Sequence, residues 1–287
     1  MRTFSKQPNE INHEYINCPV CGGEDFSLKW DLQGYAFSRC RNCGLLLQNP
    51  QPKSAELIQR YDREYFEYEI ENAETYLQLM LLALQDVDFF SGLEAAAGIA
   101  DSKGCSKRFL DVGCATGALL AYLKKRGWKE KGVEVCGPAA EYARSVRGVD
   151  VYTGTLDNAG LEDSSFDIVH ASHLIEHLNQ PAEFVRDVYR LLKPGGRVLL
   201  TTPNSSGLQA RLFDGAWRSA IADHMFLFSK QTLSILLKRN GFEIERIKTW
   251  GGIAAGMAPA PVKRVLDLLV KKTGWGDVMI IRARKPA

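Results

Sequence analysis

The sequence predicts an α/β fold in which a parallel sheet is wound in both directions from its first strand. Three observations support this prediction. A short apolar segment, 108–112, runs into a glycine-containing turn, and a helix-forming segment follows at 118–126. Strand-like and helix-like segments then alternate as far as residue 202, which is typical of a parallel sheet built from βαβ units. Two further segments, 242–250 and 277–284, have the character of a closing pair of strands.

The composition is that of a globular protein with a sizeable core. Of 287 residues, 45% are hydrophobic and 10% aromatic, which argues against disorder. The formal net charge is only +2, so no net field attracts nucleic acid. No apolar run approaches the roughly 20 residues that cross a bilayer, and residues 1–15 lack the apolar centre of a signal peptide. We therefore expect a cytoplasmic protein without a membrane span.

Two Cys-x-x-Cys pairs lie near the N-terminus. Cys18 and Cys21 form the first pair, Cys40 and Cys43 form the second, and a glycine follows each pair. Two such turns, joined by a hairpin-length segment, supply the four sulfur ligands that tetrahedral Zn²⁺ prefers. In a cytosolic chain the pattern favours metal over disulfides, and a redox dithiol or unused cysteines are the alternatives. We predict a structural zinc ribbon over residues 1–52.

The charge of this segment bears on its partner. Residues 1–50 contain five basic and five acidic side chains. A ribbon that binds RNA or DNA should be basic. The neutral balance therefore favours packing or substrate docking over a nucleic-acid partner.

Residues 53–104 are rich in Leu, Glu, Ala and Gln, and we expect them to be largely helical and to link the ribbon to the core. Ser54 is a candidate N-cap. An aromatic group includes Tyr61, Tyr65, Phe66 and Tyr68. Two interpretations remain open, a helical pair packed on the core and a lid that closes over cofactor and substrate.

The central turn reads Asp111-x-Gly113-x-Ala115-x-Gly117. Glycines allow positive φ and remove Cβ atoms that would hold a ligand away. The alanine replaces the second glycine of the dinucleotide fingerprint. The segment resembles motif I of the class I S-adenosylmethionine-dependent methyltransferases. An acidic residue, Glu134, ends the predicted second strand, where its carboxylate could accept hydrogen bonds from both ribose hydroxyls.

Later segments strengthen the resemblance. Phe-Asp-Ile-Val at 166–169, Leu-Ile-Glu-His-Leu at 174–178 and Leu-Leu-Lys-Pro-Gly-Gly at 191–196 closely resemble motifs IV to VI of that superfamily. The resemblance implies a Rossmann-like doubly wound sheet of seven strands, the last antiparallel, with helices on both faces. The third strand is followed by Gly-Thr-Leu-Asp at 154–157, without the adenine-binding Asp that these enzymes often place there. The cofactor-binding residues that it implies are Asp111, Gly113, Cys114, Ala115, Gly117, Glu134, Val135, Thr155, Leu156, Ala171 and Ser172.

Two histidines are candidate general bases. His173 follows the fourth predicted strand, where the methyl group of the cofactor should emerge, and His224 lies in a loop opposite. An imidazole with a pKa near 6.5 suits proton abstraction from a hydroxyl or carbon acid. His177 is expected to be structural, bonded across the loop to Glu176.

The function predicted from these features is methyl transfer from S-adenosylmethionine to a hydroxyl, amine or carbon of a small sugar, lipid or secondary metabolite. An rRNA or tRNA methyltransferase and a non-enzymatic cofactor-binding scaffold are the alternatives. The predicted core spans 105–287, with substrate-loop insertions at 203–228 and 251–276. The sequence leaves the acceptor and the oligomeric state open.

Overall fold

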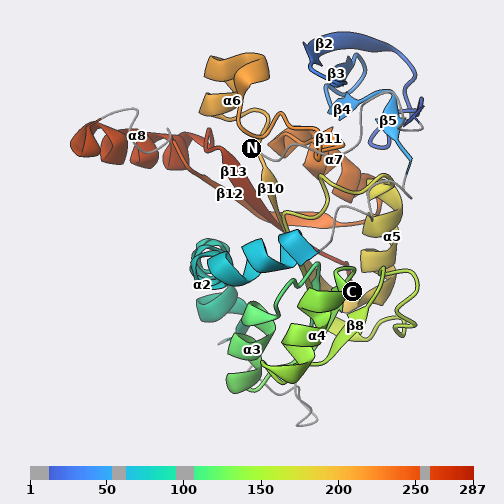
Figure 1. Cartoon of the computed structure of the whole chain (residues 1–287), viewed down its shortest axis with the longest axis vertical. Coiled ribbons are helices and arrows are strands. Elements are labelled where there is room, and N and C mark those ends of the chain that lie inside the picture. Colours follow the sequence, from blue (N-terminus) through green and yellow to red (C-terminus); the bar gives the residue numbers. More distant parts are fainter. Residues whose placement is uncertain (1–12, 54–62, 95–106, 253–258) are drawn as a thin grey trace.

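The structure is a computed structural model that describes residues 13–53, 63–94, 107–252 and 259–287. A sheet of seven strands forms its centre, in the order β12-β13-β10-β9-β6-β7-β8. Helices lie around this sheet (Figure 1). The strands β6 to β10 pair in parallel, whereas β13 is antiparallel to both β10 and β12. The predicted fold, with an antiparallel last strand, is therefore confirmed. The strands of this sheet are β6 (Arg108–Val112), β7 (Lys129–Glu134), β8 (Val151–Thr153), β9 (Phe166–Ser172), β10 (Leu192–Pro203), β12 (Glu243–Trp250) and β13 (Val278–Arg284).

Helices cover both faces of the sheet, as the alternation of side chains along each strand requires. Leu110 and Val169 point into one core with helices α5 and α7. Phe109 and Ile168, their neighbours in sequence, point into a second core with α3, α4 and the end of α2. The helices around the sheet are α2 (Arg63–Asp86), the π-helix η2 (Phe89–Glu94), α3 (Ala118–Lys125), α4 (Gly137–Ser145), α5 (Pro181–Leu191), α7 (Lys230–Arg239) and α8 (Ala260–Thr273).

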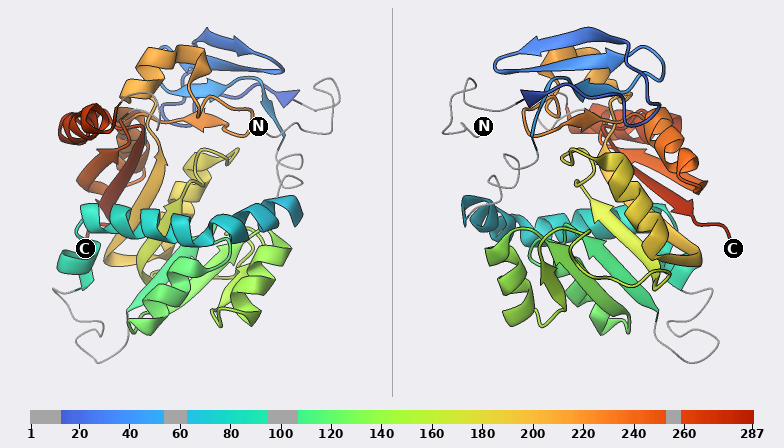
Figure 2. Two further views of the ribbon diagram at one scale, coloured as in Figure 1. Left: turned by 60° about the vertical axis from the view of Figure 1, so that its left-hand side comes forward. Right: turned by 90° about the vertical axis from the view of Figure 1, so that its right-hand side faces the viewer.

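A second sheet, of four strands, lies at one end of the molecule (Figure 2). Three strands come from the cysteine-containing segment, β2 (Phe26–Leu32), β3 (Tyr35–Cys40) and β4 (Leu46–Gln48). The fourth, β11 (Phe226–Leu227), comes from the insertion after β10 and pairs antiparallel with β4. A two-residue pairing joins β1 (His13–Glu14) to β5 (Gln51–Pro52).

The insertion at 203–228 also contains helix α6 (Leu208–Phe213) and the 3₁₀ turn η3 (Asp214–Ala216). Trp217 is buried in one cluster with Trp30 and Phe37 of the ribbon. Its indole N–H donates to the buried Asp277 carboxylate at 2.6 Å. The insertion is thus packed between the ribbon and the last strand of the sheet.

The segment predicted as a linker or lid contains one 24-residue helix, α2, followed by η2. Phe66 packs edge-to-face on Tyr142 of α4, with ring centroids 6.0 Å apart. Ser54 and Tyr61 lie outside the described residues. Among the helices that the structure describes, none is both long and apolar enough to cross a membrane.

Candidate functional site

The glycine-containing loop after β6 is folded tightly against β7. Gly113 and Gly117 have φ of 72° and 70°, and Ala115 between them has φ of 45°. A Cβ on Gly117 would lie 2.9 Å from both Ala143 Cβ and Val149 Cγ2. Glycine is therefore required at 117 by backbone conformation and by space.

Glu134 connects this loop to the start of α4. Its Oε2 accepts a hydrogen bond from the Ala115 amide and its Oε1 accepts one from the Cys136 amide, both at 2.8 Å. The side chain is buried, and burial raises the pKa of the carboxyl. A carboxylate offers about four acceptor positions, so each oxygen keeps capacity for another donor such as a ribose hydroxyl.

Asp111 has a partner that the sequence analysis missed. His170 on β9 lies with Nδ1 2.7 Å from Asp111 Oδ1, and both side chains are buried. The two strands are neighbours in register, with Asp111 opposite His170. A histidine opposite the motif I aspartate becomes visible only when the strand order is known.

The other predicted cofactor residues lie at the same edge of the sheet, because the carboxyl ends of parallel strands meet there. Val112 pairs with Ala171, and Thr201 pairs with Ser172. The Thr155 hydroxyl accepts from Asn158 at 2.9 Å. Gly117 provides no side-chain cap for α3, which leaves the first amides of that helix suited to a carboxylate such as that of a bound amino-acid moiety. Of the remaining predicted residues, Cys114 lies in the glycine loop, Val135 directly follows β7, and Leu156 comes three residues after the end of β8.

His173 and Glu176 form a hydrogen-bonded pair beside this loop. His173 Nδ1 donates to Glu176 Oε1 at 3.1 Å, and Thr202 donates to Oε2 at 2.9 Å. Burial alone would raise the pKa of the Glu176 carboxyl, but the His173 hydrogen bond and the charges of the nearby histidines lower this pKa to about 2. The pair is close to the glycine loop, since a Cβ on Gly113 would meet Leu174 Cδ1 at 3.3 Å.

The environment of His173 suits a general base. Its side chain is 49% exposed, whereas Glu176 is fully buried. The backbone has φ of 52° and its amide donates to the Thr201 carbonyl. A non-glycine residue in this region is strained and must be held by its surroundings. When Nδ1 donates its proton in a hydrogen bond to the carboxylate, Nε2 is the nitrogen that can accept a proton from an acceptor.

His224 lies in the loop before β11, and its side chain is buried there; its role as a base stays a prediction. It is 7% exposed, its Nδ1 donates to the Ser219 carbonyl at 2.8 Å, and burial together with His177 lowers its pKa to about 4. The predicted bond between His177 and Glu176 is not formed. His177 Nδ1 donates to the Asp223 carbonyl at 2.9 Å, and Glu176 accepts a hydrogen bond from His173. Packing of the insertion against the ribbon produces this burial, which local sequence does not reveal.

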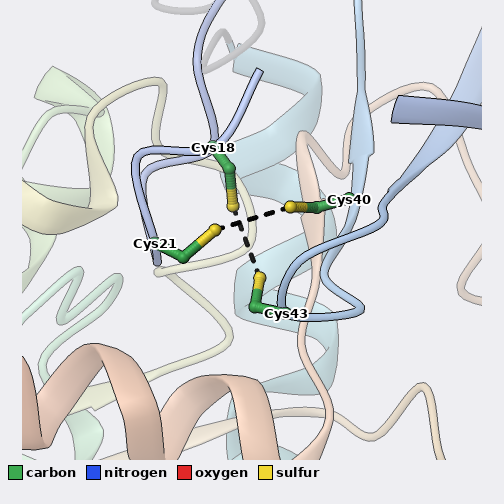
Figure 3. A group of neighbouring side chains, drawn as sticks. All are labelled: Cys18, Cys21, Cys40 and Cys43. Atoms are coloured by element: carbon green, nitrogen blue, oxygen red, sulfur yellow. Dashed lines mark hydrogen bonds between the residues drawn. The ribbon is translucent and has the colours of Figure 1, made fainter. Parts of the chain in front are cut away.

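The four predicted zinc ligands converge on one point (Figure 3). The Sγ atoms of Cys18 and Cys43 are 3.5 Å apart, as are those of Cys21 and Cys40, and all four lie within 4.8 Å of one another. Tetrahedral zinc with Zn–S bonds of about 2.3 Å places its sulfurs about 3.8 Å apart. The cluster therefore fits one Zn²⁺ ion.

Comparison with known proteins agrees with this geometry. Residues 81–247, more than half of the chain, match the family described as Methyltransferase domain. A ubiquinone biosynthesis O-methyltransferase of Neisseria meningitidis is 34% identical over 110 residues, which cover 36% of this chain and 46% of the relative. One from Pseudomonas aeruginosa is 32% identical over 118 residues, covering 39% and 49%. The chain thus spans about half the length of the curated relatives it matches.

Solved structures share the fold. A SAM-dependent methyltransferase from Thermotoga maritima superposes with a TM-score of 0.53 at 23% identity, over 77% of this chain and 98% of that chain. One from Archaeoglobus fulgidus gives 0.55 at 20% identity, over 77% and 99%. The family match, together with this fold, shows that the chain belongs to the methyltransferase domain family.

Proposed function

We propose that this protein is an enzyme that transfers a methyl group from S-adenosylmethionine to a hydroxyl of a small organic acceptor. The observation that supports this most directly is the His173–Glu176 pair next to the glycine loop. An amine acceptor would need no base, so a buried carboxylate that orients an exposed imidazole favours a hydroxyl or carbon acid. The similarity to ubiquinone biosynthesis O-methyltransferases supports an oxygen acceptor.

The cofactor would lie across the carboxyl edge of the sheet. Glu134 would accept hydrogen bonds from its ribose, and the residues after β8, Thr155 and Leu156, would contact its adenine. When bound, S-adenosylmethionine supplies an electrophilic methyl group on a cationic sulfonium. Aligning the acceptor oxygen with that methyl group and excluding water is the main contribution of the protein.

His173 would act on the acceptor. Its Nε2 would take the hydroxyl proton while the acceptor oxygen bonds to the methyl carbon and the bond from that carbon to the cofactor sulfur breaks. The proton then rests on the imidazole, and the Glu176 carboxylate stabilises the resulting positive charge. The products are the methyl ether and the demethylated cofactor.

The test is methyl transfer from radiolabelled S-adenosylmethionine to three acceptor panels, of small phenols and sugars, of small amines, and of tRNA and rRNA. Label in a hydroxyl-bearing small molecule supports the proposal. Label in RNA alone would replace it with the RNA alternative. Binding of the cofactor without transfer to any panel, after a wide acceptor search, would favour a binding scaffold.

A further inference from the structure

A second cluster of metal-ligating side chains lies beside His173. Glu176 and His177 follow β9, and His224 precedes β11. One ligand atom from each of these three residues lies within 4.8 Å of the others. The two imidazole rings meet edge to face, with centroids 4.7 Å apart. We call Glu176, His177 and His224 the EHH cluster.

The hydrogen bonds of the two rings show that Nδ1 of each ring carries a proton. His177 Nδ1 faces the carbonyl of Asp223, and His224 Nδ1 faces the carbonyl of Ser219. A carbonyl oxygen accepts hydrogen bonds and does not donate them, so each Nδ1 carries the proton. Nε2 is therefore the nitrogen of each ring that can offer a lone pair to a metal ion. Metal-ligating histidines almost always have this arrangement, in which the far nitrogen donates to a carbonyl or carboxylate.

The carboxylate of the EHH cluster is stabilised by neighbouring histidines and not, within the described part of the chain, by a Lys or Arg. Glu176 is fully buried, and its hydrogen bonds come from His173 and Thr202. Among the residues that the structure describes, no Lys or Arg makes an ion pair with it. A buried carboxylate charge is costly unless it is paired or coordinates a metal. Its two hydrogen bonds leave about two acceptor positions unused.

We propose that the EHH cluster binds a divalent transition-metal ion at a site separate from the cysteine cluster. Two imidazoles and a carboxylate are a donor set that suits Zn²⁺, Co²⁺, Fe²⁺ or Ni²⁺ and leaves coordination positions open. Ligand atoms about 2.1 Å from one ion lie about 3–4.2 Å apart. One ligand atom from each residue lies no more than 4.8 Å from the others, so an adjustment of less than about an ångström brings these atoms to the upper end of that range.

The ion would have a role in methyl transfer that rests on the proposed function. His173 bonds to Glu176, so an ion on the same carboxylate lies next to the proposed base. An acceptor oxygen in an open position would be oriented and made more acidic. Acceptors with two neighbouring oxygens, which chelate an ion, would then be favoured.

The experiment measures Co²⁺ uptake by the zinc-loaded chain without any acceptor. Equilibrium dialysis gives the stoichiometry, and the absorption spectrum identifies the ligands. Cobalt bound by imidazole and carboxylate shows weak d–d bands, whereas cobalt exchanged into the cysteine cluster shows intense thiolate charge-transfer bands. We expect one additional Co²⁺ per chain with d–d bands only.

Ligand variants localise the ion. His177→Ala and His224→Ala should each weaken Co²⁺ binding by about 10–100-fold or more, at least the loss seen when an outer hydrogen-bond partner is removed. His13→Ala, on β1 and outside the EHH cluster, should bind as the parent does. Removing the buried His224 side chain can disturb folding, so His177→Gln, at a half-buried position, is a second variant. Far-UV circular dichroism verifies that this variant is folded.

Absence of uptake, charge-transfer bands alone, or unchanged binding in a correctly folded His177→Gln chain would each overturn the site. The failure of the proposed function is a separate result. An ion that binds to a chain with no methyl-transfer activity leaves the site intact and removes the function. Methyl transfer by a chain that takes up no second ion leaves the proposed function intact and removes the metal site.

Discussion

Glu134 links two elements through one side chain, since its two oxygens accept the amides of Ala115 and Cys136. In the proposed complex the same carboxylate also accepts the ribose hydroxyls. Glutamine keeps the size of the side chain but has no negative charge. Its NH₂ group replaces one acceptor oxygen and cannot accept a hydrogen bond from a backbone N–H or a ribose hydroxyl.

We expect Glu134→Gln to weaken binding of the demethylated cofactor by about 1.5–3 kcal/mol, the range for hydrogen bonds to a charged group. Isothermal titration calorimetry measures the change. Glu141→Gln on the exposed surface of α4 is the control and should bind normally. An unchanged dissociation constant in Glu134→Gln would contradict this placement of the ribose.

His173 is the residue on which the proposed proton transfer depends. His173→Ala should lower kcat for a hydroxyl acceptor by about 10²–10⁴-fold, the usual contribution of a general base, while cofactor affinity stays unchanged. Steady-state kinetics and calorimetry test the two parts separately. Full activity of the variant on a hydroxyl acceptor would rule out His173 as the base, and full activity on an amine alone would identify a different acceptor class.

At the scale of elements, the pairing of β4 with β11 joins segments about 180 residues apart in sequence. Gln48 at the end of β4 is buried, and its Nε2 donates to the carbonyls of Ala222 and His224 at 2.9 and 2.8 Å. The cysteine-containing segment thus holds the loop that carries His224.

Gln48→Ala should lower the free energy of unfolding by about 1–3 kcal/mol, because two carbonyls lose this buried donor. It should also weaken Co²⁺ binding at the EHH cluster, although Gln48 provides no ligand to the ion. Urea denaturation and equilibrium dialysis measure the two effects. Gln78→Ala on the exposed face of α2 is the matched control, and equal metal affinity in both variants would contradict a positioning role for Gln48.

At the scale of the whole molecule, the ribbon and the core share their hydrophobic interior. Cys18, Val20, Cys40 and Leu47 belong to the same buried cluster as the sheet and helices α5 and α7. Burial raises the pKa of the Cys43 thiol to about 11, so without a metal this thiol stays protonated at neutral pH. Zinc binding would therefore release protons, and it would stabilise the core as well as the ribbon.

We expect Cys40→Ser to carry one zinc ion per chain fewer than the parent by metal analysis. Its thermal unfolding should remain a single transition at a lower Tm, with about 2–4 °C lost for each kcal/mol. The exposed Arg41→Ala, in the same turn, should keep both zinc and Tm. A ribbon transition separate from an unchanged core transition would show that the two fold independently.

The sequence by itself determined the central sheet and the two cysteine pairs, whose members are close in the chain. Strand periodicity and glycine turns are local properties, so 108–112 matches β6 residue for residue, and 242–250 and 277–284 match β12 and β13 to within one residue. The cysteine pairs predict their own convergence because each pair already shares a turn. Which residues hold the cofactor and which carry out the chemistry stay predictions.

Only the tertiary structure decided the surroundings of the histidines. From the sequence, we expected His224 in a loop opposite His173 and a bond between His177 and Glu176. In the structure, His224 is buried between the ribbon and the core. Glu176 accepts its histidine hydrogen bond from His173 and not from His177. These contacts depend on β11 joining a sheet whose other strands lie about 180 to 200 residues earlier. Such pairing follows from the packing of whole elements, which local patterns of residues do not encode.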